Sequence, residues 1–580
     1  MKHSTHINKS YCHLGGDVPL LGKTIPEHFA NIVDRFPDSE AIVSIPQDRR
    51  LTYVQLKSEV DVLARGLLGL GFKKGERIGI WSTNNIEWLL LQMATAQIGV
   101  VLVNINPAYR ILELAHALQQ SEVHGLFVIP SFRNSDYISM LVEMIPELKM
   151  HISGKISNQD FNFLKKIVVY DPAAPGKTQR PYSGFTTWQE VIQAAEKITL
   201  ENLQEVTDSL DMDDAINIQY TSGTTGFPKA VVLTHHNILN NAYFSALAMK
   251  YTETDRLVVP VPFYHCFGMV LANLLCFSVG ACLVISCEHF DAGKVLHAID
   301  KEQCTGIHGV PTMFIAELEH PEFKKYNLSS LRTGIMAGAP CPPELMTQVM
   351  EDMYCSQILI GYGETEASPL THLTAINDSL EQRTQTVGTN LPHQEVKVVD
   401  IKTRKLLPTG GVGEIYFRGY HIMKAYYGDT KATSEAIDES GWLASGDLGT
   451  MDANGYVKIT GRLKEMIIRG GENIYPREIE DFIFTHPKVE EVAVFGIPDK
   501  FYGEELMAWI QLHKGEKLSD EEVRTYCKGK IAHFKIPKYI WFVQEFPMTV
   551  TGKLQKFRMR EVACEKLHLE KNLVAATVNS

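Results

Sequence analysis

Residues 220–230 read YTSGTTGFPKA, and this short stretch determines how the surrounding chain is interpreted. Two glycines, four hydroxyl side chains and one lysine lie together, a composition typical of a loop that holds phosphate. The apolar run AVVL that follows predicts a strand, and Thr234 then predicts the N-cap of a helix. We therefore expect a loop between two strands, with no helix N-terminus directed at the phosphates.

The segment from Gly223 to Lys229 has a superficial likeness to the Walker A loop, G-x-x-x-x-G-K-[ST]. Pro228 comes directly before Lys229 and no Ser or Thr follows it, so the spacing argues against a Walker-type kinase. Hydroxyl groups and glycine N–H groups are then the expected phosphate donors, and Lys229 adds a positive charge. For this stretch alone, a polar hairpin without a ligand is the alternative interpretation.

Strands and helices alternate on the N-terminal side of this loop. Thr24 and Glu27 form a capping box with Pro26 inside it, which predicts a helix start. A second helix is predicted over 53–69 and a third over 86–97, with the strands RIGIWS and VVLVNI between and after them. Alternation of this kind predicts a doubly wound α/β fold.

The sequence pattern changes twice toward the C-terminus. From about 388 to 463, period-two alternation in EVKVVD and GEIYFRG predicts a small β-rich subdomain. From 464 onward the pattern predicts a compact α+β unit. We therefore expect a large domain over 1–463 and a small mobile C-terminal domain over 464–580. The polar, glycine-containing segment GRLKEMIIRGGENIYP is the expected joint between them.

Composition excludes several classes of protein. The 580 residues contain 56 Lys plus Arg and 68 Asp plus Glu, a net charge of −12, so no nucleic-acid partner is expected. The ten cysteines lack C-x-x-C spacing and are expected to be free thiols in a reducing cytosol. The first residues contain no apolar signal region, which favours a cytoplasmic location.

One uncharged apolar segment, residues 263–287, is long enough to cross a bilayer. It contains His265 and Asn273 and is broken at Gly280. We interpret it as a buried helix to about Val279 followed by a buried strand, with a membrane span as the alternative. At most, peripheral membrane contact is expected.

The loop YTSGTTGFPKA resembles the signature loop of the adenylate-forming superfamily of acyl-CoA synthetases, luciferases and peptide-synthetase adenylation domains. Six further motifs follow in the family's order: PFYHCFG at 262, MAGAP at 336, GYGETE at 361, SGDLG at 445, GRLKEMI at 461 and TGKLQK at 551. The resemblance covers nearly the whole chain. The medium-chain fatty acyl-CoA ligases are especially similar, through YHCFG, IIRGGENIYP and AHFKIPKY. Ala230 stands where the family usually has glycine, and since it opens a β run we expect no loss of activity.

This resemblance implies a two-step reaction. A fatty acid carboxylate attacks the α-phosphorus of ATP to give acyl-AMP and pyrophosphate, and the thiol of CoA then displaces AMP. ATP, Mg²⁺ and CoA are the implied small molecules. Because the substrate is the first nucleophile, no Ser-His-Asp array is required, and no G-x-S-x-G motif occurs.

The resemblance also assigns roles to individual residues. Tyr362 would stack on adenine, Asp447 would accept hydrogen bonds from the ribose, and Arg462 would reach the ribose or a phosphate. Thr365 would contact the α-phosphate, and Lys553 would neutralise it in the transition state. The ATP- and AMP-binding positions implied are Thr221, Ser222, Gly223, Thr224, Thr225, Gly226, Phe227, Pro228, Lys229, Gly338, Ala339, Tyr362, Asp447 and Arg462.

The remaining implied positions concern the metal, the second substrate and the hinge. Mg²⁺ would be held by Thr224 and Glu366, and the hinge would be Lys464. The implied catalytic residues are Lys553, Glu366, Thr365 and His265. The CoA-binding residues implied are Arg469, Gly470 and Gly471.

Three alternatives to a medium-chain ligase remain. The chain could adenylate another acid, long-chain, branched or aromatic, because an apolar pocket around His265, 309–313 and 336–340 does not fix chain length. It could transfer the acyl group to a carrier protein, or be a non-catalytic acyl-nucleotide binding protein. The sequence does not specify the oligomeric state.

Overall fold

The structure is a computed structural model that describes residues 8–149, 156, 158–221, 228–470, 472–548 and 554–569. The chain divides into two compact units. The larger unit comprises Cys12–Val396 and Phe417–Leu443, and the smaller comprises Met1–Tyr11, Lys397–Tyr416 and Ala444–Ser580. The expected domain boundary at 463/464 stays a prediction.

An eight-stranded sheet of the larger unit has the order β10-β9-β6-β4-β5-β11-β12-β22. Its strands are parallel from β10 to β11, whereas β12 and β22 are antiparallel to their neighbours. The bounds are β10 (Thr186–Thr187), β9 (Lys166–Val169), β6 (Gly125–Val128), β4 (Arg77–Trp81), β5 (Val101–Ile105), β11 (Ala215–Thr221), β12 (Lys229–Thr234) and β22 (Ala425–Tyr426).

A nine-stranded sheet of the same unit has the order β19-β18-β17-β16-β15-β13-β14-β2-β3. The six strands from β17 to β2 are parallel, and antiparallel strands flank them. The bounds are β19 (Thr389–Asn390), β18 (Leu370–Leu373), β17 (Gln357–Gly363), β16 (Thr333–Ala337), β15 (Gly306–Gly309), β13 (Arg256–Val258), β14 (Cys282–Ile285), β2 (Glu40–Ser44) and β3 (Arg49–Thr52). Both sheets confirm the predicted mixed α/β class.

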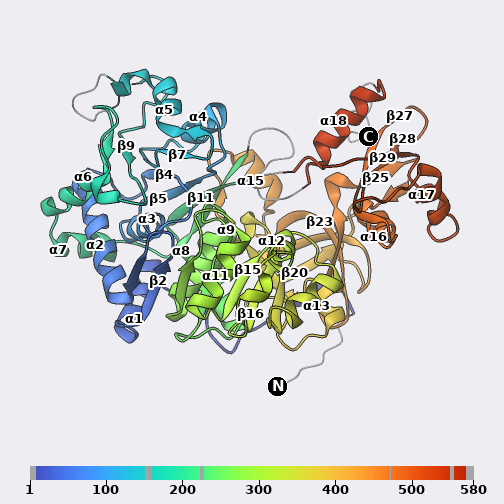
Figure 1. The fold of residues 1–580 in the computed structure, drawn as a ribbon, viewed down its shortest axis with the longest axis horizontal. Coiled ribbons are helices and arrows are strands. Elements are labelled where there is room, and N and C mark those ends of the chain that lie inside the picture. Colours follow the sequence, from blue (N-terminus) through green and yellow to red (C-terminus); the bar gives the residue numbers. More distant parts are fainter. Residues whose placement is uncertain are drawn as a thin grey trace. The chain divides into compact units, whose positions relative to one another are not determined.

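Helices connect these strands, as Figure 1 shows for the blue to yellow part of the chain. The capping box predicted at Thr24 and Glu27 is present at the start of α1 (Ile25–Arg35), with both reciprocal bonds formed. The predicted helices over 53–69 and 86–97 are α2 (Tyr53–Gly69) and α3 (Ile86–Gln97). Further helices are α4 (Ile111–Gln120), α5 (Tyr137–Met144), α6 (Trp188–Ala194), α7 (Leu200–Asp208), α8 (His235–Ala248), α11 (Ala292–Glu302), α12 (Pro311–Leu318), α13 (Pro343–Glu351), α14 (Leu380–Gln385) and α15 (Thr430–Ala436).

The apolar segment 263–287 is a buried helix followed by a buried strand, as predicted. The helix consists of α9 (Cys266–Gly268), a π-helical stretch over Met269–Leu274, and α10 (Leu275–Val279). It ends at Gly280, whose φ of 89° is the left-handed conformation that favours glycine. Strand β14 follows. Within the described ranges, no helix is both long enough and apolar enough to cross a bilayer.

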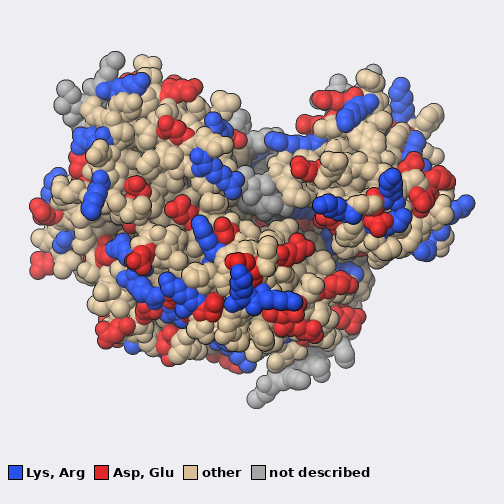
Figure 2. All heavy atoms as spheres, viewed as in Figure 1, with Lys and Arg blue, Asp and Glu red and all other residues tan. Residues whose placement is uncertain are grey.

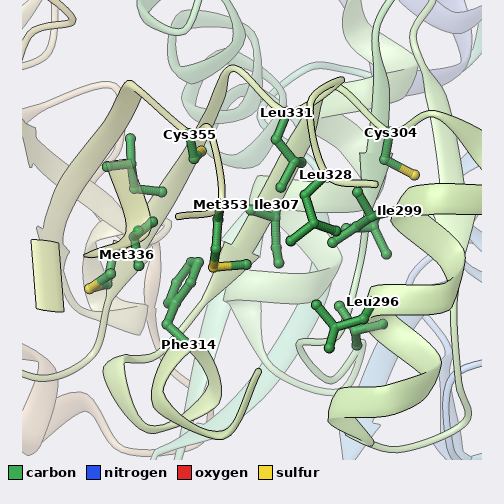
Figure 3. Close-up of a cluster of buried hydrophobic side chains, with 14 of the residues drawn as sticks. Leu296, Ile299, Cys304, Ile307, Phe314, Leu328, Leu331, Met336, Met353 and Cys355 are labelled. Atoms are coloured by element: carbon green, nitrogen blue, oxygen red, sulfur yellow. The ribbon is translucent and has the colours of Figure 1, made fainter. Parts of the chain in front are cut away.

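The apolar core of the nine-stranded sheet lies between its strands and the helices α11 to α13. Figure 3 shows Leu296 and Ile299 of α11 and Phe314 of α12 pointing toward Ile307 of β15. All four side chains are essentially inaccessible to solvent. This packing fixes the positions of the loops that leave the carboxyl ends of the parallel strands.

A five-stranded sheet has the order β1-β20-β21-β23-β24. Its bounds are β1 (Tyr11–His13), β20 (Gln394–Val399), β21 (Gly413–Gly419), β23 (Leu443–Met451) and β24 (Val457–Arg462). The period-two pattern of EVKVVD and GEIYFRG is thus confirmed as β-structure. The sequence did not suggest the short strand β1.

The C-terminal part of the smaller unit is a second small sheet with three helices. The order is β26-β25-β28-β27, and β29 pairs with β28. The bounds are β25 (Ile467–Arg469), β26 (Glu472–Ile474), β27 (Val489–Asp499), β28 (Gly503–Leu512), β29 (Tyr539–Phe542), α16 (Pro476–Phe484), α17 (Asp520–Cys527) and α18 (Lys556–Lys566). The predicted cap of Ser519 and Glu522 is present at α17.

Acidic and basic side chains are interspersed on the face of the molecule shown in Figure 2. Several of them form ion pairs, such as Arg418 with Glu395 and Arg332 with Asp255. All ten cysteines lie in the described ranges, where all are buried thiols outside any disulfide.

Candidate active site

The candidate phosphate loop connects two antiparallel strands. Strands β11 and β12 pair in a register that sets Thr221 opposite Lys229 and Tyr220 opposite Ala230. Helix α8 begins only after β12, where Thr234 accepts a hydrogen bond from the Asn237 backbone N–H. The predicted strand–loop–strand arrangement is therefore confirmed. Residues 222–227, which include most of the predicted phosphate donors, lie outside the described residues.

Ala230 occupies an ordinary strand position. It is fully buried, and its carbonyl accepts a hydrogen bond of 2.8 Å from the Tyr427 N–H. Its φ is not among the positive values in the chain. Alanine therefore meets the backbone requirement of this position, where glycine's additional conformational freedom is not used.

Lys229, Tyr426 and Glu366 form a cluster beside this loop. The Lys229 ammonium lies over the Tyr426 ring, 4.4 Å from its centroid. The Tyr426 hydroxyl, at the edge of the same ring, donates a hydrogen bond of 2.9 Å to Oε1 of Glu366. Burial, and then the charge of Glu366, raises the pKa of Tyr426, so the phenol retains the proton it donates. The cluster therefore contains a cation and a carboxylate joined through one aromatic side chain.

Several predicted site residues follow the carboxyl ends of parallel strands in the nine-stranded sheet. Tyr362 lies near the end of β17, and its ring packs against His372 and Phe417 at centroid distances of 6.0 and 6.2 Å. Burial lowers the pKa of His372 to about 3, so this neighbour is uncharged. The Thr371 hydroxyl donates to the Tyr362 carbonyl at 3.0 Å. The Tyr362 ring is thus half-buried and held in place by His372 and Phe417.

Gly338 and Ala339 follow the adjacent strand β16 and are exposed. Gly338 has a φ of 88°, and an added Cβ would lie 3.2 Å from a methyl group of Val310. The backbone conformation therefore favours glycine here, and an added side chain would in addition require a small shift of Val310. Binding sites of open α/β sheets lie at this edge, outside the carboxyl ends of the strands.

Two of the predicted catalytic residues lie on either side of Cys266. The Cys266 sulfur is 3.6 Å from Nδ1 of His265 and 3.8 Å from Oγ1 of Thr365. Nδ1 of His265 also accepts a hydrogen bond of 3.1 Å from the Phe267 N–H, so in the neutral ring the proton is on Nε2. Thr365 is buried, whereas His265 is half-buried. The structure thus brings His265 and Thr365 together, although they are 100 positions apart in sequence.

In the smaller unit, Asp447 and Arg462 are direct partners across strands β23 and β24. Arg462 Nε lies 3.2 Å from Oδ1 of Asp447. The Asp447 carboxylate is largely buried, while the Arg462 side chain is 54% exposed. The Ser445 hydroxyl accepts a 3.0 Å bond from the Asp447 N–H and fixes this turn. The pair therefore presents a carboxylate that is oriented by a neighbouring guanidinium.

The predicted CoA segment is only partly described. Arg469 makes two hydrogen bonds with buried Glu505, at 2.6 and 3.0 Å, and its guanidinium lies over the Tyr502 ring. The hydrogen bonds that Arg469 donates to Glu505 raise the pKa of Arg469. Gly470 has a φ of 59° and an added Cβ would lie 3.2 Å from the Tyr502 ring. Lys464 is exposed on a 3₁₀ turn, Leu463–Glu465, whereas Gly471 and Lys553 lie outside the described residues.

Two family models match the chain. Residues 29–427 match the model described as AMP-binding enzyme, and 478–553 match that described as AMP-binding enzyme C-terminal domain. The first match covers more than half of the chain. The chain belongs to the AMP-binding enzyme family.

Relatives of this AMP-binding enzyme extend over nearly the same length. It is 47% identical over 550 residues to the putative acyl-CoA synthetase YngI of Bacillus subtilis, covering 95% of this chain and 99% of that one. It is 40% identical over 555 residues to the human medium-chain acyl-CoA ligase ACSF2, mitochondrial, covering 95% and 89%. Among solved structures, ATP-bound MatB from Rhodopseudomonas palustris superposes with a TM-score of 0.79 at 26% identity, covering 94% and 100%.

A second solved structure is the anthranilate CoA ligase AuaEII in complex with anthranoyl-AMP. It superposes on this AMP-binding enzyme with a TM-score of 0.79 at 26% identity, covering 95% of this chain and 99% of that one. The matches confirm the predicted superfamily and its fold, a large N-terminal domain with a smaller C-terminal one.

Sequence reasoning missed two features of this AMP-binding enzyme. One is Tyr426, which bridges Lys229 and Glu366 but lies in a tyrosine pair without any distinguishing local pattern. The other is Lys556, three positions after Lys553, whose ammonium is 3.0 Å from Glu465 and 2.7 Å from Glu480. Burial alone would lower the pKa of Lys556, but these two carboxylates raise it. Neither pairing has a sequence signal, because the partners are far apart along the chain.

Proposed function

We propose that the protein is an ATP-dependent medium-chain fatty acid–CoA ligase. The fatty acid carboxylate oxygen bonds to the α-phosphorus of ATP as the bond to pyrophosphate breaks, giving acyl-AMP. The CoA sulfur then bonds to the acyl carbon, AMP leaves, and the thiol proton is released. The observation that carries the proposal is the Lys229–Tyr426–Glu366 cluster beside the phosphate-loop hairpin. Relatives named acyl-CoA synthetase and medium-chain acyl-CoA ligase support the substrate class.

In this proposal, the larger unit binds the triphosphate. The loop residues 221–228 and Lys229 would surround the β- and γ-phosphates with hydroxyl, backbone N–H and ammonium groups. Tyr362 would stack on adenine, supported by His372 and Phe417. Gly338 and Ala339 would lie along the nucleotide, where the exposed backbone after β16 allows close approach.

The residues present fit a magnesium ion. Mg²⁺ is a hard cation that proteins usually hold through one or two carboxylates together with substrate phosphates. Half-buried Glu366 supplies such a carboxylate, one oxygen of which is oriented by Tyr426. Thr224 is the second proposed contact. When bound, the ion would neutralise charge on the phosphate oxygens.

The remaining groups would act on the α-phosphate and the ribose. The Thr365 hydroxyl would donate to the α-phosphate, and Lys553 would neutralise charge that develops there. Asp447 would accept hydrogen bonds from the ribose hydroxyls, oriented by Arg462. No acid–base side chain is needed, because the attacking carboxylate is already ionised at neutral pH.

The acyl group and CoA would occupy separate sites. His265, 309–313 and 336–340 lie at or after the carboxyl ends of parallel strands of the nine-stranded sheet, and we propose that they surround the acyl group near the carboxylate. Arg469, Gly470 and Gly471 would receive the pantetheine arm. The domains 1–463 and 464–580 would alternate about Lys464 between the two half-reactions.

Cellular location is a separate question. The cytoplasmic location expected from the sequence stays a prediction, since the ACSF2 relatives carry the word mitochondrial in their names and the Bacillus relative does not. Fractionation of the native organism with compartment markers would decide it.

The decisive experiment mixes purified protein with ATP, Mg²⁺ and straight-chain fatty acids of increasing length, with and without CoA. Pyrophosphate and acyl-CoA are measured together, with Lys553→Ala as the control. Both products from medium chains, lost in the control, would support the proposal and set the chain length. Pyrophosphate without thioester would point to a different acceptor, and no pyrophosphate with any acid would reject the fatty-acid assignment.

A further inference from the structure

The backbone of Tyr426 is fixed by a neighbouring strand and by the helix that follows it. Strand β22 is the outermost strand of the eight-stranded sheet, where Tyr426 pairs with Val231 of β12. The Tyr426 N–H donates a 3.0 Å hydrogen bond to the Thr433 hydroxyl. Its side chain is only 8% exposed. The ring therefore has little freedom to move relative to Lys229, which opens β12 two residues before Val231.

Glu366 lies between two strands of the nine-stranded sheet. It lies on a 3₁₀ turn, Thr365–Ala367, just after the carboxyl end of β17. Its carbonyl accepts a hydrogen bond of 2.8 Å from the Met423 N–H, three residues before Tyr426. The 2.9 Å bond from the Tyr426 hydroxyl then fixes Oε1 of its carboxylate. One tyrosine thus joins the loop after the nine-stranded sheet to the edge of the eight-stranded sheet.

The arrangement keeps two opposite charges apart. Among the residues that the structure describes, neither Lys229 nor Glu366 takes part in an ion pair. The ammonium contacts the negative face of the phenol ring, and the carboxylate contacts the hydroxyl at the ring's edge. A direct lysine–carboxylate pair would neutralise both groups. Because each of the two groups contacts the tyrosine, the ammonium stays available to phosphate and the second carboxylate oxygen to a cation.

We propose that Tyr426 is a positioning residue for the metal–nucleotide complex. Its hydroxyl orients the Glu366 carboxylate toward the cation, and its ring holds Lys229 toward the phosphates. This inference rests on the proposed function, because it takes Glu366 as the magnesium carboxylate. In this proposal Tyr426 contacts a metal-binding residue and not the metal itself. Loss of such an orienting hydrogen bond typically weakens metal affinity or activity by about 10–100-fold.

The chain provides a matched control in the next residue. The Tyr427 hydroxyl donates a hydrogen bond of 2.8 Å to Glu122, and a cation, Arg77, lies 5.4 Å from its ring centroid. Tyr427→Phe therefore removes a phenol–carboxylate bond of the same kind from the residue that follows the same strand, without changing a contact of Glu366. Tyr426→Phe removes the hydroxyl that contacts Glu366 and retains the ring under Lys229.

The test measures equilibrium binding of a non-hydrolysable ATP analogue by calorimetry, at a series of Mg²⁺ concentrations. For Tyr426→Phe we expect the Mg²⁺ concentration for half-maximal enhancement of binding to rise about 10–100-fold. Binding without Mg²⁺ should stay within about twofold of wild type. Tyr427→Phe should match wild type in both conditions. An unchanged Mg²⁺ dependence in Tyr426→Phe, or an equal change in Tyr427→Phe, would overturn the inference.

A double-mutant cycle separates orientation of Glu366 from a general structural effect. In the Glu366→Gln background, Tyr426→Phe should cause less than a twofold further change in the Mg²⁺ dependence. A full effect in that background would contradict the inference. Because binding is measured without any fatty acid, these results stand even if the wild-type protein ligates no acid, an outcome that would reject the proposed function alone.

Discussion

Two charged clusters of the larger unit differ in how their charges are compensated. The first joins Arg50 and Arg256 to Glu40 and Glu302. Arg256 contacts Glu40 and Glu302 at 2.8 Å each, and Arg50 contacts Glu40 at 3.0 Å and also Glu302. Two cations and two carboxylates therefore form a closed ring, which connects β2, β3, β13 and α11.

The second cluster, Lys229–Tyr426–Glu366, is open. Its cation and its carboxylate contact a neutral ring and a hydroxyl, so neither charge is cancelled within the cluster. The comparison indicates how one chain uses charged groups for two purposes. A closed ring stabilises the fold, whereas an open cluster keeps charge available for a ligand, and substitutions should separate stability from activity accordingly.

The largest effect is expected from opening the closed ring. Glu302→Ala removes a nearly inaccessible carboxylate and leaves two guanidinium groups with one partner. The Arg50 side chain is 47% exposed and that of Arg256 21%, so the cost should lie below the about 3–5 kcal/mol of a fully buried pair, and we expect unfolding at lower denaturant concentration. Adenylation per folded molecule should be unchanged, because the ring contains no proposed site residue. Retained stability with lost activity would reverse the assignment of the two clusters.

Breaking the open cluster should lower activity and leave stability nearly unchanged. For Glu366→Gln we expect the adenylation rate to fall about 10²–10³-fold, since a single preorganised charge is lost from the site. Thermal unfolding should stay close to that of wild type, because no ion pair of the described residues is broken. Pyrophosphate release and the thermal midpoint are measured in parallel, with the exposed Glu435→Gln as the surface control. A large drop in the thermal midpoint would show that Glu366 is structural.

A smaller effect, on stability, should appear when Glu40 of the closed ring is titrated. Burial alone would raise the pKa of Glu40, but hydrogen bonds from Arg256 and Arg50 lower it below the ordinary 4.5. A carboxylate with a lowered folded-state pKa stabilises the protein above its unfolded pKa, and this contribution is lost as pH falls. The stability difference between wild type and Glu40→Gln should therefore be constant above about pH 5.5 and shrink below 4.5. A difference that grows with acidification would contradict this sign.

The smallest effect is expected at Ala230. Because this residue is an ordinary strand position, Ala230→Gly should leave adenylation within about twofold of wild type and cost about 0.5–1 kcal/mol of stability. A tenfold rise in rate would show that the loop needs glycine's freedom. Steady-state kinetics and denaturant unfolding on the same preparations check both values.

Local signals predicted much of this structure. The capping box of Thr24 and Glu27, the helix over 53–69 and the strand–loop–strand around 220–230 each depend on residues within a few positions of one another. Thr234 likewise caps α8 as predicted. Where the physical cause is a cap, an apolar face or a turn, the sequence alone specifies the element.

Features that depend on distant packing were not predictable. Glu366 and Tyr426 are 60 positions apart, and nothing in the sequence between them indicates their hydrogen bond. The π-helical turn over Met269–Leu274 occurs within a uniformly apolar run, so its extra residue per turn leaves no periodic trace. The roles of the site residues came from the family resemblance. Residues 222–227, Gly471 and Lys553, whose roles were assigned in this way, lie outside the described residues.

The burial of every cysteine has a consequence for a ligase that builds thioesters. An acyl-adenylate reacts with any accessible thiolate, so a surface thiol near the site would divert acyl groups onto the enzyme itself. Here all ten thiols are enclosed, and burial raises the pKa of Cys276, Cys304 and Cys355 among others. Even Cys266, beside His265 and Thr365, is only 2% exposed. CoA would then meet no competing sulfur nucleophile from the chain, and self-acylation would be suppressed by packing alone.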